Sequence, residues 1–576
     1  MLTVLKRLKP YRAQIAIVVL LLFVMVICDL YLPNLMSEIV NTGIPSGDTG
    51  YVLFIGLRML AVALIGTACS VTASYFSSRV SMGFGRALRS ETFSHVTSFS
   101  LTEVDTIGTS SLITRTTNDV IQLQNMMMMA LRMMVSVPLN MIGGIVMAVS
   151  KDIILACVVL GVVPILALVI VLSVRKVMPI FKTTQVKLDR LNQVFREKLS
   201  GIRVIRAFRR ENHEKERFED ANMDLSKNTL GAFRIMVRMM PLAMFFMNLA
   251  AVAIIWVGAT RIDAGFLAVG DLMAFLQYVT IILFSIMMGS MMIVMLPRAS
   301  VSADRIAEVL ALENSVHDPE TETRPDESSR GHLRFDHVTF RYPGAEEPVL
   351  RDISFEANPG ETVAIIGGTG SGKSTLAKLI PRFFDVAEGS IALNGVDARN
   401  MSQKTLRARI GFVPQRAMLF SGTIRENLSY GNPGATDEEL RKAAEIAQAL
   451  DFISALPEGM DAPVSQDSTN LSGGQKQRLS IARAIAMSPE VFVFDDSFSA
   501  LDFKTDTALR AALREVTADK TVILIAQRVS TIMTADRILV LDDGEAKGLG
   551  THAELLETCP TYREIVESQL HKEDIA

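Results

Sequence analysis

Six long apolar stretches in the first half of the chain constrain its fold more than any other feature. They cover approximately residues 14–38, 52–77, 128–150, 152–174, 237–260 and 268–295. A helix needs about 20 apolar residues to cross a hydrocarbon core of roughly 30 Å, and each stretch is long enough. The sequence therefore predicts six membrane-spanning helices. The first stretch has no small-residue cleavage site and more spans follow it, so we expect a permanent anchor and not a signal peptide.

Composition differs between the two halves of the chain. The 576 residues are 49% apolar and 21% charged, with a net charge of −3. Apolar runs fill the first 300 residues, whereas the remainder has the composition of a soluble α/β protein. No basic field is present to attract nucleic acid, which makes a nucleic-acid partner improbable. The four cysteines, three of them in apolar runs, form no C-x-x-C pair, so we interpret them as small packed hydrophobes.

Charge in the connecting segments predicts the orientation of the spans. Lys and Arg gather in residues 1–13, 78–127 and 175–236, whereas 39–51 has neither. The two short connections carry only Lys151 and Arg261. Because cytoplasmic loops are enriched in Lys and Arg, both termini are expected in the cytoplasm.

The two long cytoplasmic loops keep helical periodicity and charged faces. We expect the spanning helices to continue well past the bilayer, each loop reversing through a short turn. One turn is predicted near residues 100–113 and the other near 208–220. The alternative is a disordered cytoplasmic loop.

A few polar and many methionine residues lie inside the spans. The polar residues include Asp29, Asn34, Arg58, Asn140, Asn248 and Gln277. Asp29 either faces a functional cavity or is a carboxylate near the outer interface that a neighbouring helix satisfies. Methionine clusters suit a cavity that accepts varied apolar ligands, although helix filler explains most of the 31 methionines equally well.

A polar, acidic, Pro-containing segment at 314–331 is interpreted as a linker between a membrane domain, 1–313, and a second domain, 332–576. Beyond it, short β-branched runs alternate with helical patterns. This alternation predicts a largely parallel sheet flanked by helices.

A phosphate-binding loop follows one of these predicted strands. The run Gly367, Gly368, Thr369, Gly370, Ser371, Gly372, Lys373, Ser374 matches G-x-x-x-x-G-K-[ST] between a strand and a helix, and Thr375 follows it. Glycines let backbone N–H groups close around phosphate oxygens at a helix N-terminus. Lys373 would reach the β/γ-phosphates and Ser374 would ligate Mg²⁺. ATP and Mg²⁺ are the expected cofactors.

A second strand supplies a carboxylate for the same site. The apolar run 491–494 ends in Asp495, about 120 residues after the phosphate-binding loop. A carboxylate in this position is expected to hold Mg²⁺.

The run Leu471, Ser472, Gly473, Gly474, Gln475 resembles the signature of ABC transporter ATPases. With the phosphate-binding loop and the six-span order, the whole chain resembles an ABC exporter half-transporter. The resemblance implies six helices with long cytoplasmic extensions fused to an α/β P-loop ATPase with a helical subdomain. It also implies that two ATPase domains meet head to tail, with ATP between one P-loop and the other signature. Ser472 and the Gly473 and Gly474 N–H groups at a helix start would form such an anion site.

The resemblance places three further elements. Tyr342 matches the aromatic residue that stacks on adenine, with a core tyrosine at a strand end as the alternative. Gln415 matches the glutamine that contacts Mg²⁺ and the attacking water. Ser499 to Asp502 match the loop that communicates across the dimer, with Asp502 among the nucleotide-binding residues.

Three positions depart from the family pattern. Asp496 stands where the family usually has the Glu that polarises the attacking water, which withdraws the carboxylate by about 1.5 Å. Gln527 stands where a His is expected, and glutamine carries no positive charge. Ser465 to Ser468 replace the usual Gly-Glu-x-Gly before the signature.

These departures predict the degenerate half of a heterodimeric exporter. Its own site would bind ATP and hydrolyse it poorly, while its signature would complete a competent site on a partner half-transporter. The alternative is a homodimer in which Asp496 is a slow base. We expect export of hydrophobic or amphipathic, multidrug-like compounds across a prokaryotic plasma membrane. A lipid, peptide or metallophore transporter of the same fold, and a regulatory subunit that binds ATP, are the other hypotheses.

Overall fold

The computed structural model describes residue 4 and residues 6–569. The chain divides into two compact units. One comprises Met1–Thr97 and Ser110–Leu312, and the other comprises Ser98–Thr109 and Glu313–Ala576. We call them the membrane unit and the nucleotide unit and describe each by itself.

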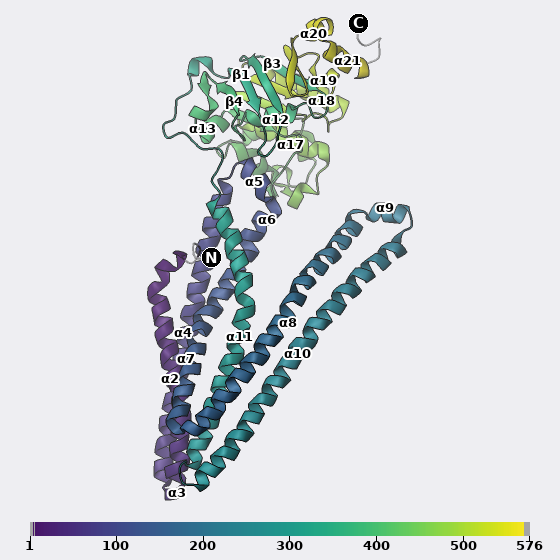
Figure 1. Ribbon diagram of the computed structural model, residues 1–576. Coiled ribbons are helices and arrows are strands. Elements are labelled where there is room, and N and C mark those ends of the chain that lie inside the picture. The colour runs from purple at the N-terminus through teal and green to yellow at the C-terminus, as the bar shows by residue number, and fades with distance from the viewer. Residues whose placement is uncertain (1–3, 5, 570–576) are drawn as a thin grey trace. The chain divides into compact units, whose positions relative to one another are not determined.

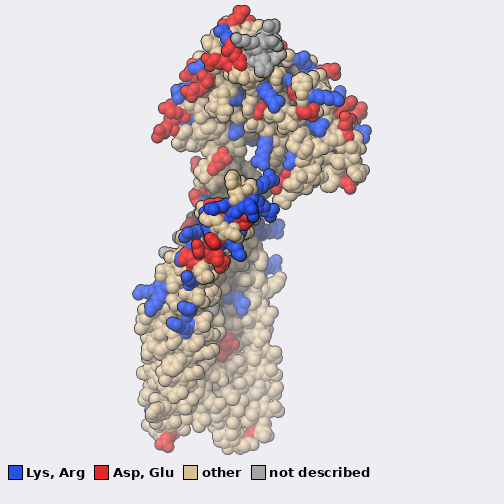
Figure 2. Space-filling model, turned by 90° about the vertical axis from the view of Figure 1, so that its right-hand side faces the viewer, with Lys and Arg blue, Asp and Glu red and all other residues tan. Residues whose placement is uncertain are grey.

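The membrane unit is entirely helical over its described residues (Figure 1). Its elements are η1 (Lys6–Tyr11), α2 (Arg12–Glu38), the π-helical turn η2 (Ile39–Gly43), α3 (Ile44–Ser46), α4 (Thr49–Thr97), α6 (Thr109–Thr114), the π-helical turn η3 (Arg115–Asp119), α7 (Val120–Lys151), α8 (Ile153–Ser200), α9 (Ile202–Ala207), α10 (Glu211–Asp263) and α11 (Val269–Ala311). Among the described residues, six helices are long and apolar enough to cross a membrane: α2, α4, α7, α8, α10 and α11. This confirms the six apolar helices expected from the sequence. Figure 2 shows a broad surface of this unit that is almost free of charge.

Partly buried ion pairs join the helix ends at the short connections. Asp152 caps the N-terminus of α8, accepting hydrogen bonds from the Ile154 and Leu155 N–H groups, and it pairs with Arg261 at 2.8 Å. Lys151 pairs with Asp271 at 2.7 Å. The two basic residues of the short connections are therefore neutralised locally by carboxylates, which explains why they occur where loops otherwise lack Lys and Arg.

Helices α8 and α10 extend far past the apolar stretches. They contain 48 and 53 residues, which corresponds to about 70 Å and 80 Å and is more than twice a hydrocarbon core. Beyond the apolar part they lie side by side and pair through Lys187 with Asp224 and through Arg217 with Glu197, each at 2.7 Å (Figure 1). This confirms the expected helical extensions.

The turn between α8 and α10 corrects one prediction. The reversal lies at residues 201–210, through Gly201, α9 and Arg209, whose φ of 50° is left-handed. The predicted turn at 208–220 was wrong over 211–220, where α10 has already begun. Glu211 and Glu214 lie in its first turn, where acidic residues favour a helix N-terminus, so the density of charge did not mark a loop.

A short helix, α5 (Leu101–Ile107), replaces a simple turn within the predicted reversal at 100–113. Ser100 and Glu103 form a capping box at its start. The buried Glu103 carboxylate also accepts the Ser315 N–H at 3.0 Å, and Ser100 N–H donates to Asn314 at 2.9 Å. These contacts explain why Ser98–Thr109 belongs to the nucleotide unit, although it joins two membrane helices.

The nucleotide unit contains three sheets. Its strands are β1 (Leu333–Phe340), β2 (Leu350–Ala357), β3 (Thr362–Gly367), β4 (Glu388–Leu393), β5 (Val396–Asp397), β6 (Ile410–Val413), β7 (Gly422–Thr423), β8 (Pro463–Val464), β9 (Val491–Asp495), β10 (Thr521–Ile525), β11 (Arg537–Asp542) and β12 (Glu545–Gly550). The main sheet has the order β12-β11-β3-β10-β9-β6, and all neighbours are parallel except β12. This confirms the largely parallel sheet. An antiparallel sheet in the order β2-β1-β4-β5 was not anticipated.

Helices cover the main sheet and form a helical subdomain. The helical elements are η4 (Glu327–Ser329), α12 (Lys373–Leu379), η5 (Ala398–Asn400), α13 (Gln403–Arg407), α14 (Ile424–Leu428), η6 (Ser429–Gly431), α15 (Asp437–Ile446), α16 (Leu450–Ser454), η7 (Gly459–Asp461), η8 (Gln466–Ser468), α17 (Gly473–Ala486), α18 (Phe503–Val516), α19 (Val529–Ile532), α20 (His552–Thr558) and α21 (Pro560–Gln569). Buried residues of α14 to α17 share one apolar core with the face of β9 that carries Phe492 and Phe494. The opposite face, with Val491 and Val493, packs on the core of the antiparallel sheet.

Candidate nucleotide-binding site

The phosphate-binding loop connects β3 to α12, at the carboxyl end of a central parallel strand. Edges of this kind are where open α/β sheets bind ligands. Two of its glycines are required by close approach: a Cβ at Gly367 would lie 2.1 Å from the Leu541 carbonyl oxygen, and one at Gly372 would lie 2.7 Å from Leu350. A Cβ at Gly368 or Gly370 would meet nothing within 4 Å, so the loop is open on the side where a phosphate would approach.

The Lys373 side chain folds back over this loop. Its Nζ donates to the carbonyl oxygens of Gly367 at 2.7 Å and Gly368 at 2.6 Å, and it lies 3.4 Å from Ser371 Oγ. Burial lowers the pKa of Lys373, while the charges of Asp496 and Asp495 oppose that shift. The ammonium group is held inside the loop by dipoles, where phosphate oxygens would replace the carbonyls as its partners.

Two oxygen donors meet beside the loop. Ser374 Oγ donates to Asp495 Oδ1 at 3.0 Å, which joins the start of α12 to the end of β9. Burial is the main cause that raises the pKa of Asp495, and the Ser374 hydrogen bond opposes it. A hydroxyl and a carboxylate oxygen are ligands that Mg²⁺ prefers, and the two lie 3.0 Å apart here. The residues present therefore fit the cation that accompanies ATP.

Two predicted glutamine side chains from separate segments converge on one carboxylate oxygen of a third predicted residue, Asp496. Asp496 Oδ2 accepts Gln415 Nε2 at 3.1 Å and Gln527 Nε2 at 2.8 Å. Gln415 follows β6, Asp496 follows β9 and Gln527 follows β10, and these are neighbouring strands. Burial is the main cause that raises the pKa of Asp496, and the hydrogen bond from Gln415 opposes it. Asp496 has a φ of 48°, so the turn after β9 holds its backbone in a strained, left-handed conformation.

Tyr342 contacts the helix that follows the phosphate-binding loop. Its hydroxyl is 3.1 Å from Thr375 Oγ1, and its ring packs edge-to-face on Phe340 and Phe384 at centroid distances of 4.9 and 5.4 Å. The ring is half-buried. The structure thus shows the packing expected of a tyrosine at a strand end, and one part of the ring is still exposed. Its stacking on adenine stays a prediction.

The signature run begins α17, as its sequence suggested. Ser472 is the N-cap and forms a capping box with Gln475: Ser472 Oγ accepts the Gln475 N–H at 3.3 Å, and Gln475 Oε1 accepts the Ser472 N–H at 2.8 Å. Ser472 and Gly473 are exposed, and a Cβ at Gly473 would meet nothing within 4 Å. Among the described residues no hydrogen bond joins this run to the phosphate-binding loop. The two anion sites of the chain are separate.

The remaining predicted positions have structural roles of their own. Asp502 caps α18 and accepts the Thr505 N–H at 3.0 Å. Asp467 and the buried Ser468 both have left-handed φ values, 55° and 49°. That conformation favours glycine, which explains why the family pattern has Gly at the end of this turn and why its loss is unexpected.

Some residues of interest were missed by sequence reasoning. Glu103 lies within the predicted turn, and the S-x-x-E spacing from Ser100 was the signal for its capping box. Arg132 is an ionisable residue inside the apolar stretch 128–150, a rare feature that indicates function. Asp29, by contrast, is exposed and has no hydrogen bond or ion pair with any described residue, so neither interpretation of it is decided.

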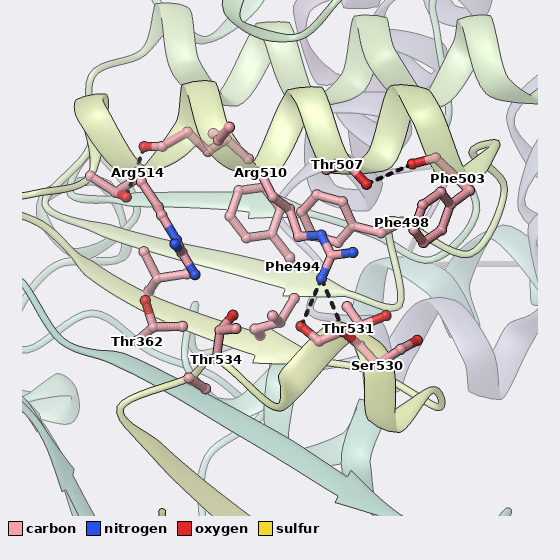
Figure 3. A pocket seen from close by; sticks show the side chains of 16 residues that line it. Thr362, Phe494, Phe498, Phe503, Thr507, Arg510, Arg514, Ser530, Thr531 and Thr534 are labelled. Atoms are coloured by element: carbon pink, nitrogen blue, oxygen red, sulfur yellow. Dashed lines mark hydrogen bonds between the residues drawn. The ribbon is translucent and has the colours of Figure 1, made fainter. Parts of the chain in front are cut away.

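A separate cavity of about 510 Å³ lies under α18. Figure 3 shows Phe494, Phe498 and Arg510 around it, with Arg510 donating to the carbonyl oxygens of Ser530 and Thr531. None of the predicted nucleotide-binding residues lines it. The candidate site is the open edge of the sheet, not this cavity.

The fold and site together define a multi-pass membrane protein fused to a P-loop ATPase. Comparison with known proteins supports this class. Residues 15–287 match the family model described as ABC transporter transmembrane region, and residues 350–499 match the model described as ABC transporter.

Several curated proteins are similar over most of their length. The chain is 42% identical over 567 residues to an uncharacterized ABC transporter ATP-binding protein of Mycobacterium tuberculosis, covering 98% of this chain and 97% of that protein. It is 36% identical over 452 residues to a protein of Mycobacterium bovis named fatty acid ABC transporter ATP-binding/permease protein, covering 78% and 71%. The solved structure of a bacterial Atm1-family ABC exporter with ATP bound superposes with a TM-score of 0.78 at 26% identity, covering 97% of this chain and 99% of that one.

The chain therefore belongs to the ABC transporter family. It combines the membrane and ATP-binding domains in one polypeptide and has the fold of an Atm1-family exporter. The ATPase domain of this family binds ATP, normally with Mg²⁺, and couples its hydrolysis to transport.

Proposed function

We propose that this chain is the degenerate half of a heterodimeric, ATP-driven exporter in a prokaryotic plasma membrane, with both termini in the cytoplasm. The exporter moves hydrophobic or amphipathic compounds out of the cell. The chain binds Mg-ATP in its own site, cleaves it slowly and supplies its signature to the competent site of a second half-transporter.

The environment of Asp496 carries this proposal. A base for the attacking water needs a free carboxylate oxygen within hydrogen-bond reach. The side chain of Asp496 is one methylene shorter than the glutamate that the family usually has here. Its Oδ2 accepts hydrogen bonds from both the Gln415 and Gln527 amides. Both amides occupy the same oxygen, the Gln415 hydrogen bond opposes the rise in pKa that burial causes, and Gln527 provides no cationic charge toward a γ-phosphate.

The residues expected to bind ATP and Mg²⁺, in contrast to Asp496, keep the family pattern. The phosphate-binding loop is open, Lys373 lies within it, and Ser374 and Asp495 form a pair suited to Mg²⁺. When bound, Mg²⁺ neutralises charge on the β- and γ-phosphate oxygens. Tyr342, Thr375 and the loop residues hold the nucleotide, and Gln415 is placed to contact the cation through its amide oxygen, which accepts no hydrogen bond from a described residue.

The signature needs a nucleotide from another chain. Ser472 and Gly473 are exposed at the N-terminus of a 14-residue helix, which favours anions, and the chain's own phosphate-binding loop does not contact them. In the exporter, ATP binding would bring the two nucleotide domains together, with Asp502 near the junction. The reversals at 100–113 and 201–210 would pass the motion to the spanning helices, and hydrolysis would reset it.

Two alternatives are compatible with the fold. A homodimer would use Asp496 as a slow base in two equal sites. A lipid, peptide or metallophore transporter would share the architecture, and the fatty-acid name of one relative favours an amphipathic cargo over a polar one.

The test compares ATP binding with ATP hydrolysis by the purified chain without a partner. We expect Mg-dependent binding of a fluorescent ATP analogue, abolished by Lys373→Ala, together with hydrolysis far below the usual enzyme range of about 1–10³ s⁻¹. Fast, cooperative hydrolysis by this chain alone would contradict the proposal. Copurification from native membranes with a second half-transporter that carries Glu and His at the equivalent positions would support it.

A further inference from the structure

A cation with no partner among the described residues lies within the third membrane helix. Arg132 of α7 is four residues into the apolar stretch 128–150, which corresponds to about 6 Å of helix. Its guanidinium makes no hydrogen bond or ion pair with a described residue. A charged group at membrane depth is costly unless it faces a cavity or a partner, so this arginine needs an explanation.

Arg132 faces a cavity of about 630 Å³, a size typical of small-molecule sites. The wall is partly polar, with Asn125, Asn140 and Ser136 beside Arg132, and partly made of methionine. Asn140 Oδ1 is enclosed and accepts no hydrogen bond from any residue that the structure describes. An unsatisfied buried amide oxygen costs free energy, and a hydrogen-bond donor such as water or a hydroxyl would satisfy it.

A second, apolar cavity adjoins the first. It has a volume of about 320 Å³ and an almost wholly apolar wall formed by α2, α7 and α11. Met129 and Met295 line both cavities, so the two share a boundary of flexible side chains. No Asp or Glu lines either cavity. Together the two cavities have one positively charged end and one apolar end.

We propose that these two cavities form the binding site for an anionic amphiphile with a long hydrocarbon tail, such as a fatty acid. The carboxylate accepts hydrogen bonds from the Arg132 guanidinium. The tail passes Met129 and Met295 into the apolar cavity, where methionine adapts to chains of different length. This inference rests on the proposed export function and names its substrate class.

The size of the effect follows from the contacts. Removing one partner of a charge-assisted hydrogen bond weakens binding by about tenfold or more. Each additional CH₂ buried in the apolar cavity tightens binding by about threefold to fourfold until the cavity is full. Head-group and tail effects are therefore separately measurable.

The experiment uses the transporter purified as assembled in native membranes and placed in lipid nanodiscs. The probe is hexadecanoate with a diazirine at the tail end, and the matched uncharged probe is the corresponding hexadecanol. We expect the acid to label peptides of α7 and α11 about tenfold more than the alcohol does, with competition by unlabelled hexadecanoate. A series of shorter acids should compete progressively less well.

Substitutions test the role of the cation. Arg132→Gln should lower acid labelling about tenfold and leave alcohol labelling unchanged, while Arg132→Lys should restore much of it. Arg58→Gln is the matched control, because Arg58 lies in another span, contacts Tyr31 and lines neither cavity. It should label like the wild type.

Equal labelling by acid and alcohol in the wild type would overturn the proposal and needs no variant. So would unchanged acid labelling of Arg132→Gln, which would mean that the side chain only reaches toward the membrane surface. The proposal would also be overturned if acid and alcohol label the wild type equally and Arg132→Gln no longer assembles with its partner half-transporter. Arg132 would then be assigned to an ion pair with that partner. If the transporter still hydrolyses ATP in any of these cases, the proposed fatty-acid site is refuted and the proposed export function is not. A purified transporter that shows neither ATP hydrolysis nor transport would refute the export function itself.

Discussion

Restoring a catalytic carboxylate and a cation should activate the impaired site. The change is Asp496→Glu with Gln527→His, made in a Ser472→Arg background. Ser472→Arg places a bulky cation on the signature and silences the partner's site, so any remaining hydrolysis comes from this chain's own phosphate-binding loop. The assay is single-turnover cleavage of radiolabelled ATP by the assembled transporter.

The geometry gives the expected magnitude. Asp496 Oδ2 lies 3.1 Å from Gln415 Nε2 and 2.8 Å from Gln527 Nε2. One more methylene advances the carboxylate by about 1.5 Å, which is about half the length of either hydrogen bond. Replacing Gln527 removes one of the two amides that donate to the carboxylate oxygen. A positioned general base contributes about 10²–10⁴-fold to a rate, so we expect at least about 10²-fold faster cleavage, or ~2.7 kcal/mol of barrier.

Two results would refute this reasoning. A rate within about twofold of the Ser472→Arg background would mean that the base and the cation are not what the site lacks. Cleavage at an ordinary enzymatic rate in that background, before either change, would mean that the site was never impaired. Lys373→Ala in the activated variant is the control and should abolish the gain.

The remaining predictions concern binding, stability and the first reversal. Tyr342→Ala should weaken binding of a fluorescent ATP analogue by about tenfold, whereas Tyr342→Phe should bind like the wild type because it keeps the ring; equal loss in both would exclude stacking. Burial raises the pKa of Asp495 above its unfolded value, so the folded state binds the proton more tightly and stability falls as pH rises from about 3.9 through the folded pKa. Asp495→Asn should therefore raise the Mg-free melting temperature at pH 7, and the gain should vanish near pH 4. Glu103→Ala removes the charged acceptor of the Ser315 N–H and one of the two acceptors of the buried Ser100 N–H, at a cost of about 1–3 kcal/mol, and should speed amide exchange in 98–109, while the exposed Glu219→Ala should not.

The parts predicted well from sequence are those fixed by local pattern. Apolar length alone gives six spanning helices, and a strand followed by G-x-x-x-x-G-K-S gives the loop before α12. The capping residue Ser472 marks the start of α17, because a side-chain oxygen satisfies the first free N–H groups of a helix.

The parts that sequence did not give depend on long-range contacts. The turn at 201–210 was misplaced because acidic residues such as Glu211 stabilise a helix start as readily as they mark a loop. The antiparallel pairing of β1 with β4 joins segments about 50 residues apart and leaves no local signal. The meeting of Gln415 and Gln527 on Asp496 follows only from the order of the strands that precede them.

The most direct test of unequal sites compares two substitutions in the assembled, purified transporter. If the competent site is built on the partner's phosphate-binding loop and this chain's signature, Asp496→Asn should keep steady-state ATP hydrolysis within about twofold of the wild type. Ser472→Arg should lower it by about 10²-fold or more. Loss of hydrolysis in Asp496→Asn, as expected of two equal sites that use this carboxylate, would contradict the account.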